Sequence, residues 1–452
     1  SHEALYNPAD QRQLIGHYMA TSLVDVVGAL ASADRAQPEW DDLAPSIRAG
    51  YLHVVADLME RDLMPLVAMI VLEGGRTQVD AVSEVREAID FCRYYGLQAQ
   101  RRGDMRGRGV FLCISPWNFP LAIFVGQVAA ALLAGNTVIA KPAPQTSAIA
   151  TFAVSLFHRA GVSPEALQLV LGDGPQIAAT LLGDARIAGV AFTGSTRAAQ
   201  SINRRLAARR DGPIPLIAET GGQNCMLVDS TALAEQVVDD VIASAFGSAG
   251  QRCSALRVLF LQTDIADRVL GMLAGAMDAM SVGDPRRLSS DLGPVIDGAA
   301  QQRLHAHIER MHREAILIAK VPLGDDCKAG RYVAPHAFEI DSLAQLDGEV
   351  FGPILHVIRY SEDQLDAVLE QIEATGFGLT LGIHSRIEGF CQRVYNNTSA
   401  GNTYINRNMV GAVVGVNPFG GCGLSGTGPK AGGPNYLLGF SASATRTLAA
   451  VS

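Results

Sequence analysis

A cysteine and a glutamate, each inside a short glycine-containing motif, are the first residues of this 452-residue chain that could do chemistry. Cys253 lies in Gly-Gln-Arg-Cys-Ser at 250–254, and Glu219 begins Glu-Thr-Gly-Gly at 219–222. A thiolate attacks a carbonyl carbon, and a carboxylate can activate the water that releases the resulting acyl group. The pair therefore suggests covalent acyl chemistry.

Each of the two residues also has an ordinary alternative role. Cysteine is among the most buried residue types, so Cys253 could simply be a packing residue. The small residues at 247–250 favour chemistry, because their backbone N–H groups could stabilise a thiolate and hold an oxyanion. Glu219 could cap a helix or pair with a cation. The glycines after it suit the close approach of a ligand, and burial would raise its pKa toward that of a base.

Three more motifs stand where strands are expected to end. Asn118, within Pro-Trp-Asn-Phe-Pro at 116–120, could donate to an oxyanion or satisfy its own turn. Lys141 could be exposed to solvent or contact a ribose hydroxyl or a phosphate. Gly-Ser-Thr at 194–196 could receive a pyrophosphate at the start of a helix. No Gly-x-Gly-x-x-Gly follows an expected strand, so the ordinary Rossmann fingerprint is absent.

The elements that must position these residues change character along the chain. Residues 17–100 carry apolar positions at helical spacing and predict amphipathic helices. From residue 110, short β-branched runs alternate with Ala-rich stretches, which predicts parallel sheets wound with helices and ligands at the strand ends. The glycine-rich segment from Gly411 predicts an ordered loop that lines a site. The expected strands are 110–115, 138–140, 189–193 and 214–218, and, after the alternation restarts at Asn224, 225–228, 258–262, 354–360 and 379–384.

Composition excludes several classes of protein. The formal net charge of −9 and the lack of a dense basic block argue against nonspecific nucleic-acid binding. The arginines between 204 and 210 fit the solvated face of a helix. Seven cysteines without CxxC or Cys/His spacing indicate neither a metal site nor a disulfide framework, and they suit a reducing cytoplasm. With no apolar run of membrane-spanning length and no signal peptide, we expect a soluble cytoplasmic protein without a membrane partner.

Taken together, the motifs resemble those of the aldehyde dehydrogenase superfamily over nearly the whole chain. The agreement rests on independent motifs in the family's order. These are Pro-Trp-Asn-Phe-Pro at 116–120, Lys-Pro-Ala at 141–143, Phe-Thr-Gly-Ser at 192–195, Glu-Thr-Gly-Gly at 219–222, Gly-Gln-Arg-Cys at 250–253, Glu-Val-Phe-Gly-Pro at 349–353 and Pro-Phe-Gly-Gly at 418–421.

The resemblance implies a role for each motif. Cys253 is the expected nucleophile, Glu219 the base for hydrolysis, and Asn118 forms the oxyanion hole with the backbone N–H of Cys253. The implied reaction passes from a thiohemiacetal on the cysteine, through hydride transfer to NAD, to a thioester that water hydrolyses. The implied cofactor-binding residues are Ile114, Pro116, Trp117, Lys141, Ala143, Gly174, Phe192, Gly194, Ser195, Gly221, Glu349 and Phe351.

A closer resemblance narrows the expected substrate. Residues 248–258, 406–421 and 423–433 resemble the dehydrogenase module of bacterial proline utilisation A, which oxidises L-glutamate γ-semialdehyde, the open form of pyrroline-5-carboxylate, to L-glutamate. By that resemblance Ser254 and the backbone of Gly411 and Ala412 would hold the α-carboxylate of this small-molecule aldehyde. Phe124 and Phe419 would wall its chain.

The resemblance also implies an α/β fold with two main domains. A Rossmann-variant dinucleotide-binding domain is expected at 1–98 and 112–221, and a second α/β catalytic domain at 222–430. Segments 99–111 and 431–452 would be a shortened oligomerisation segment and a tail.

Three departures from the closer pattern leave alternatives open. The proline dehydrogenase barrel of the bifunctional proteins is absent, so we expect either an excised module or a truncated design, with a proline dehydrogenase partner or module as a candidate companion. Because the 99–111 segment is shorter than the family's usual oligomerisation hairpin, the expected assembly is either a homodimer or a monomer. Pro144 replaces an acid that many NAD-preferring relatives carry, although NAD remains the expected cofactor. A dehydrogenase of succinic semialdehyde and a non-catalytic scaffold are the competing interpretations.

Overall fold

The first half of the molecule is built on a parallel five-stranded sheet. The computed structural model describes residues 2–102 and 105–442. The strand order is β5-β4-β3-β6-β7, and every neighbouring pair is parallel. The carboxyl ends of β3, β6 and β7 carry the motifs that begin at 116, 194 and 219. The strands are β3 (Val110–Ile114), β4 (Thr137–Lys141), β5 (Leu167–Leu169), β6 (Ile187–Thr193) and β7 (Leu216–Glu219).

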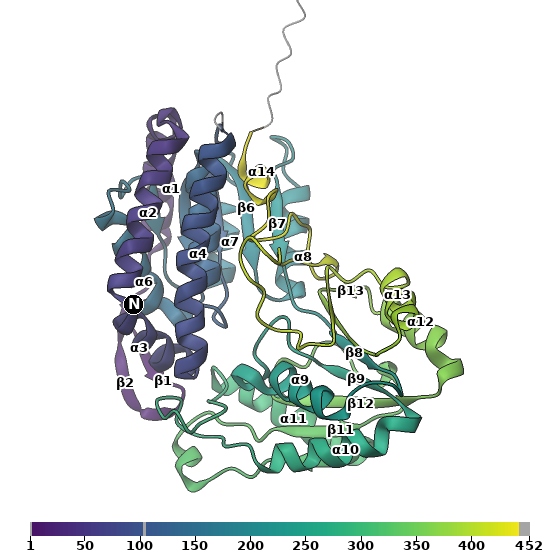
Figure 1. Cartoon of the computed structure of the whole chain (residues 1–452). Helices are drawn as coiled ribbons and strands as arrows, with labels where there is room; N and C mark the ends of the chain where they lie inside the picture. Colours follow the sequence, from purple (N-terminus) through teal and green to yellow (C-terminus); the bar gives the residue numbers. More distant parts are fainter. Residues whose placement is uncertain (1, 103–104, 443–452) are drawn as a thin grey trace, which may run out of the picture.

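Helices cover both faces of this sheet (Figure 1). Alternate residues of β3 face opposite layers: Phe111 and Cys113 pack with one helical layer, Val110 and Leu112 with the other. Such burial on both faces is typical of parallel sheets. The first layer contains α2 (Pro45–Arg61), α3 (Leu63–Gly74), α4 (Gln78–Arg102), α5 (Ala122–Leu133), α6 (Ser147–Arg159) and α14 (Tyr436–Phe440), and the second α1 (Leu23–Asp42), α7 (Gly174–Leu181) and α8 (Thr196–Ala207).

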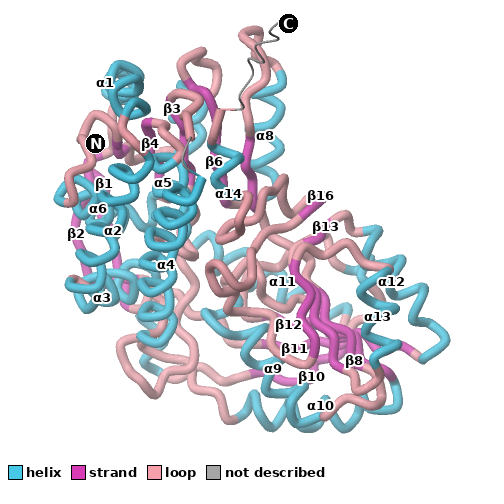
Figure 2. The backbone as a smooth tube through the Cα atoms, turned by 45° about the horizontal axis from the view of Figure 1, so that its top comes forward, coloured by secondary structure: helices cyan, strands magenta, loops and turns pink. Residues whose placement is uncertain are grey.

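The second half is built on a seven-stranded sheet, whose strands run side by side in Figure 2. Their order is β10-β11-β12-β9-β8-β14-β15, with only the β10 edge strand antiparallel to its neighbour. Two helices pack on one face and three on the other. The strands are β8 (Cys225–Val228), β9 (Val258–Gln262), β10 (Ile316–Lys320), β11 (His336–Glu339), β12 (Ile354–Tyr360), β14 (Thr380–His384) and β15 (Asn402–Ile405), and the helices α9 (Ala234–Phe246), α10 (Thr263–Asp278), α11 (Gly298–Glu314), α12 (Leu365–Ala374) and α13 (Glu388–Asn396).

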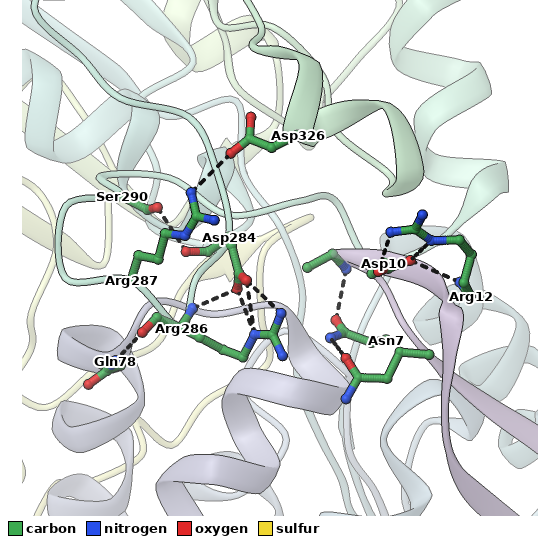
Figure 3. A network of polar contacts seen from close by, with 11 residues as sticks. Asn7, Asp10, Arg12, Gln78, Asp284, Arg286, Arg287, Ser290 and Asp326 are labelled. Carbon is green, nitrogen blue, oxygen red and sulfur yellow. Dashed lines mark hydrogen bonds and ion pairs between the residues drawn. The ribbon is translucent and has the colours of Figure 1, made fainter.

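An N-terminal hairpin and a loop of the second half meet in a polar network near the start of α4 (Figure 3). The hairpin consists of β1 (His2–Asn7) and β2 (Asp10–Met19). The Gln78 side chain at the start of α4 donates to the Arg286 carbonyl, and Arg287 pairs with Asp326 at 3.4 Å. The Arg331 N–H donates to the Pro8 carbonyl at 2.7 Å. These contacts connect the hairpin and the N-terminal end of α4 to the second half of the molecule.

The C-terminal segment passes back from the second sheet to the first. In Figure 1 it is the yellow chain that lies between the two halves. It forms the short ladder of β13 (Phe377–Gly378) with β16 (Cys422–Gly423), bridges Glu219 through Gly426, and ends in α14 against the first core. This segment is ordered and lines the site, as the sequence predicts for the chain from Gly411.

Most expected elements are present, with two differences. Strands 225–228, 258–262 and 354–360 have the expected bounds. The expectation that residues 17–100 are all helical is wrong at its start, because residues 17–19 end β2. The exposed edge strand β10 alternates too little in polarity to be recognised, and β15 and the hairpin also escaped prediction. The domain boundaries stay predictions; residues 103–104 and 443–452 of the predicted oligomerisation segment and tail lie outside the described residues.

Within the described ranges, none of the helices combines the length and the apolar character that crossing a membrane requires.

Candidate active site

Two cavities meet at Cys253. A charged cavity of about 300 Å³ lies between α4, the Cys253 loop and the C-terminal segment. A sheet-edge cavity of about 550 Å³ lies at the carboxyl ends of β3, β6 and β7, opposite α11. Four residues line both cavities, namely Ile123, Thr193, Thr220 and Cys253. The candidate nucleophile therefore stands where two ligands could meet.

The loop before Cys253 has an unusual backbone conformation. The φ angles of Ser248, Ala249 and Gly250 are 56°, 54° and 66°. These values lie in the left-handed region, which residues other than glycine rarely adopt. Asp80 of α4 stabilises this turn, because it accepts from Ser248 Oγ at 2.7 Å and pairs with Arg252 at 2.5 Å. Gln251 Nε2 also donates to the Ser248 carbonyl at 3.2 Å. These contacts explain why this turn can position the nucleophile despite its strain.

The Cys253 thiol is protonated in this environment. Burial raises its pKa to about 12, with further contributions from the carboxylates of Glu349 and Glu219. Arg257 and the Ser254 N–H act in the opposite direction but are weaker. Desolvation thus acts against the N–H groups of the small residues before Cys253, and their stabilisation of a thiolate stays a prediction.

Asn118 holds the other side of the nucleophile loop. Its Nδ2 donates to the Gln251 carbonyl at 3.1 Å, while the buried Arg76 guanidinium donates to the Asn118 carbonyl. An amide group has two N–H donors, so one remains for a ligand. Asn118 and Cys253 both line the sheet-edge cavity. The structure thus brings the two predicted oxyanion-hole residues together.

Glu219 ends β7 and points its carboxylate into a socket formed by the C-terminal segment. Its Oε2 accepts from the Gly421 N–H at 3.1 Å, and its Oε1 is buried without a donor among the described residues. A Cβ at Gly420 or Gly426 would stand only 2.6 or 2.9 Å from this carboxylate. Burial raises the pKa of Glu219 to about 8, although the Gly421 N–H and Lys430 lower it. The carboxyl group has the pKa of a base that works near neutral pH.

The sheet-edge cavity has the features of a nucleotide site. Ser195 caps α8 by accepting from the Ala198 N–H at 3.3 Å, so the helix N-terminus faces the cavity. Glu349 pairs with the buried Arg257 at 2.9 Å, and a Cβ at Gly221 would collide with its carboxylate. The predicted cofactor residues that line this cavity are Pro116, Trp117, Gly194, Ser195, Gly221, Glu349 and Phe351. Helix end, carboxylate and aromatic walls suit a dinucleotide.

The other predicted cofactor residues form a row at the same edge of the sheet but are not among those lining the cavity. Ile114 pairs in register with Lys141 on one side and Phe192 on the other. A Cβ at Gly174 would stand 3.2 Å from Lys141 Nζ, and Ala143 follows two residues after this lysine. Burial lowers the pKa of Lys141 to about 8. Their role in binding stays a prediction.

The predicted substrate residues surround the charged cavity, with one exception. Ser254, Gly411, Ala412 and Phe419 line it together with Cys253. Phe124 is fully buried in the helical core and lines neither cavity. Successive side chains of an α-helix point about 100° apart. The preceding residue, Ile123, therefore points in another direction and lines both cavities.

Sequence reasoning missed the wall that α4 contributes. Asp80, Glu84 and Glu87 follow one another at helical spacing and all line the charged cavity. Glu84 pairs with Arg76 at 3.4 Å and accepts from the Leu121 N–H at 2.8 Å, whereas Glu87 receives no such contact from the described residues. Burial raises the pKa of Glu87 to about 7. Carboxylates on the apolar face of an amphipathic helix were the signal that could have revealed this wall.

Known proteins resemble this chain over nearly all of its length. Residues 1–445 match the aldehyde dehydrogenase family. A 1-pyrroline-5-carboxylate dehydrogenase of Geobacillus thermodenitrificans is 34% identical over 452 residues, which cover 96% of this chain and 87% of that protein. The bifunctional protein PutA of Escherichia coli is 50% identical over 459 residues, covering 99% of this chain but 35% of that protein. The chain thus spans about a third of the length of its bifunctional relatives.

Solved structures agree with the fold described above. A crystal structure of bifunctional proline utilization A superposes with a TM-score of 0.91 at 53% identity, covering 94% of this chain and 45% of that one. The 1-pyrroline-5-carboxylate dehydrogenase from Thermus with bound NAD gives 0.92 at 32% identity, covering 97% and 88%. The nucleophile between two cavities, the two α/β halves and these matches lead to one conclusion: the chain belongs to the aldehyde dehydrogenase family.

Proposed function

We propose that this chain oxidises L-glutamate γ-semialdehyde to L-glutamate with NAD, a step of proline catabolism. The observation that carries the proposal is the position of Cys253 between a charged cavity and a dinucleotide-like cavity. The names of the relatives, 1-pyrroline-5-carboxylate dehydrogenase and PutA, support the same substrate.

The first step is attack by the Cys253 thiolate on the aldehyde carbon. The free N–H of the Asn118 amide and the backbone N–H of Cys253 would stabilise the oxyanion that forms. NAD, when bound, supplies a hydride acceptor. Residues Gly194, Ser195, Glu349 and Phe351 would hold it in the sheet-edge cavity. The product of the oxidation is a thioester on Cys253.

Glu219 would then activate the water that cleaves the thioester. Its ionised form takes one proton from the water, whose oxygen attacks the thioester carbon and releases the Cys253 sulfur. The glycines around the carboxylate give it room to turn from the Gly421 N–H toward Cys253. Hydrolysis rather than transfer to another thiol yields the free acid.

The charged cavity would recognise the amino-acid end of the substrate. Ser254 and the backbone of Gly411 and Ala412 would donate to its α-carboxylate, since these groups line the cavity beside the nucleophile. Glu87 has no ion-pair partner among the described residues and would pair with the α-ammonium group. An aldehyde that lacks the ammonium group would lose this contact.

The cofactor, assembly and location complete the proposal. The dinucleotide would be NAD, although Pro144 leaves no acid at that position to repel a 2′-phosphate. The protein would act in the cytoplasm, where its cysteines stay unpaired. It would be a homodimer or a monomer, and the proline dehydrogenase activity would come from a partner or a fused module.

Purified protein tests the proposal directly. With NAD, pyrroline-5-carboxylate should give NADH faster than succinic semialdehyde or simple aliphatic aldehydes do, and NADP should be a poorer cofactor. Ser254→Ala should raise the KM for the amino-acid aldehyde. Preferred turnover of succinic semialdehyde, unaffected by Ser254→Ala, would instead assign a different semialdehyde. Absence of any turnover, with Cys253 no more reactive to iodoacetamide than the other cysteines, would favour a scaffold.

A further inference from the structure

Three buried side-chain oxygens of residues that line the charged cavity accept no hydrogen bond from the described residues, and two of them also lack an ion pair, since Glu84 Oε2 pairs with Arg76 at 3.4 Å. One of these two is Glu219 Oε1, and the other is Oε1 of Gln127, a residue of α5 that is only 3% exposed. Gln127 and Glu219 line the same cavity as Cys253. Buried polar atoms in native proteins almost always have a hydrogen-bond partner. A donor in the cavity is therefore expected to serve both oxygens.

The two side chains are related through Thr193, which contacts Gln127 and pairs in register with Glu219. Gln127 Nε2 donates to Thr193 Oγ1 at 3.0 Å, which turns Oε1 of the amide away from Thr193. Thr193 and Glu219 are register partners on the parallel strands β6 and β7, so their Cα atoms lie about 4.8 Å apart. Thr193 also lines the cavity. Gln127, Thr193 and Glu219 thus form a continuous wall beside the nucleophile.

We propose that Gln127 positions the hydrolytic water, by accepting one of its O–H groups while Glu219 accepts the other. This proposal rests on the hydrolytic step of the proposed function. As Glu219 takes one proton, the water oxygen bonds to the thioester carbon, the carbon–sulfur bond breaks, and the Cys253 sulfur leaves with the bonding electrons. The products are a carboxylic acid and a thiol, and no oxidant or reductant takes part.

The physical reason for a second acceptor is orientation. A water held by one carboxylate oxygen can rotate about that hydrogen bond, so its lone pair points at the thioester for only part of the time. A second, neutral acceptor fixes the plane of the water without competing for the proton. Gln127 is neutral at every working pH and is held by Thr193, so its contribution does not titrate.

The proposal can be tested in a reaction that needs no cofactor. p-Nitrophenyl acetate would acylate Cys253 and release nitrophenolate in a burst, and the later steady release would report hydrolysis of the acyl group. Gln127→Met keeps the length of the side chain and removes the acceptor. We expect an unchanged burst and a steady rate reduced about tenfold. With NAD and the aldehyde, kcat and the KM for aldehyde should fall together.

Gln223 offers a matched control. It is another buried glutamine whose Oε1 has no donor among the described residues, but it lines a separate cavity with Cys225 and Gly378. Gln223→Met should leave the steady rate unchanged. A second variant, Gln127→Asn, withdraws the amide by one methylene and should also slow the steady phase with the burst intact. It keeps the test open if Gln127→Met does not fold.

Three outcomes would overturn the assignment. An equal loss of burst and steady rate in Gln127→Met would mean a structural role, as would a slowed steady rate in Gln223→Met. A raised KM for the amino-acid aldehyde alone, with normal ester hydrolysis, would place Gln127 on the substrate's ammonium group. If the protein failed to oxidise glutamate semialdehyde, the ester reaction would still report on Gln127, so the two failures are distinguishable.

Discussion

The two cavities that meet at Cys253 are built in opposite ways. The sheet-edge cavity is made by chain segments that follow strands β3, β6 and β7, by α11 and by residues 347–351. The charged cavity is made by long side chains of α4 and by the C-terminal segment, which come from opposite ends of the sequence. The first combines glycines and a helix N-terminus with Glu349 and two aromatic side chains, whereas the second presents a row of carboxylates and arginines from α4 and its neighbours. A flat dinucleotide needs close backbone approach, whereas a small charged aldehyde needs long polar side chains.

One buried arginine connects the two. Arg257 is 1% exposed, pairs with Glu349 of the sheet-edge cavity and donates to the carbonyls of Gly250 and Arg252 in the nucleophile loop. A change at Glu349 can therefore reach Cys253 without passing through the charged cavity. Variants on each side should separate the two functions, unless they touch this link or the shared nucleophile.

The largest effect is expected at the nucleophile that both cavities share. Cys253→Ala should lower NADH production by at least about 10⁴-fold, because no covalent intermediate can form. Ester hydrolysis should lose its burst as well. Equilibrium dialysis should still detect NAD binding, since the sheet-edge cavity keeps its other walls. Loss of NAD binding would show that the cavities are not independent.

The next effect belongs to the charged cavity alone. Glu219→Gln should preserve the burst of NADH and slow steady turnover by about 10²- to 10³-fold, because only the thioester hydrolysis needs the base. Rapid-mixing absorbance measurements separate the two phases. A burst that falls as far as the steady rate would contradict the assigned role.

The base should also give hydrolysis in the charged cavity a pH dependence of its own. Since burial raises the pKa of Glu219 to about 8, the hydrolytic rate should rise about tenfold per pH unit below that value and then level off. NAD affinity should instead weaken only as the pH rises through about 8, where Lys141, a predicted cofactor residue, loses its charge. Lys430, Glu349 and the Cys253 thiol also face this region, so the profile should be compared with that of Glu219→Gln, which should be flat.

The same carboxyl group links pH to stability. The unfolded chain releases this proton near pH 4.5, but the folded chain retains it to about pH 8. Between these values the folded state binds more protons, so this group lowers the free energy of unfolding as the pH rises. Chemical denaturation from about pH 5 to about pH 8 should show a shallower decline for Glu219→Gln than for the wild type. Equal slopes for the two proteins would mean that the pKa of Glu219 is not raised in the folded state.

The smallest effects should fall on one cavity each. Glu349→Gln should raise the KM for NAD about tenfold and change ester hydrolysis less, because Arg257 keeps its hydrogen bonds to the carbonyls of the nucleophile loop. Glu87→Gln should raise the KM for the amino-acid aldehyde by about three- to tenfold and leave the KM for NAD unchanged. Initial-rate kinetics with each substrate varied in turn measure both. A changed KM for the aldehyde in Glu349→Gln, or a changed KM for NAD in Glu87→Gln, would mean that Arg257 couples the two cavities more tightly than its contacts suggest.

The same contrast explains what could be predicted from the sequence. Several residues of the sheet-edge cavity follow strand ends, so their motifs and their place in the fold can be found by local patterning, as with Gly194, Ser195 and Gly221. In the charged cavity, the substrate-binding roles of Ser254 and Gly411 entered through resemblance, although glycine content had indicated a site-lining loop from Gly411. Asp80 and Glu87 were missed, because a carboxylate on an amphipathic helix gives no sign of which distant loop it will face.

Prediction also failed where a shift of one position along a helix changes the direction in which a side chain points. Phe124 was expected at the substrate, but the turn of α5 buries it and exposes Ile123 to both cavities. Strands buried on both faces, such as β8, β9 and β12, had clear bounds because their apolar runs are continuous. The edge strand β15 has no such run, and the run Ile-Leu-Ile-Ala of the exposed edge strand β10 was not recognised as a strand.

The socket around Glu219 has a consequence for recombining this protein with its relatives. The acid lies 202 residues before Gly421, whose N–H it accepts, and the space it occupies exists because Gly420 and Gly426 lack side chains. A chimera joined anywhere between these positions takes the acid from one parent and its space from the other. Crossovers in that long interval should therefore succeed only when the second parent also leaves both positions without a side chain.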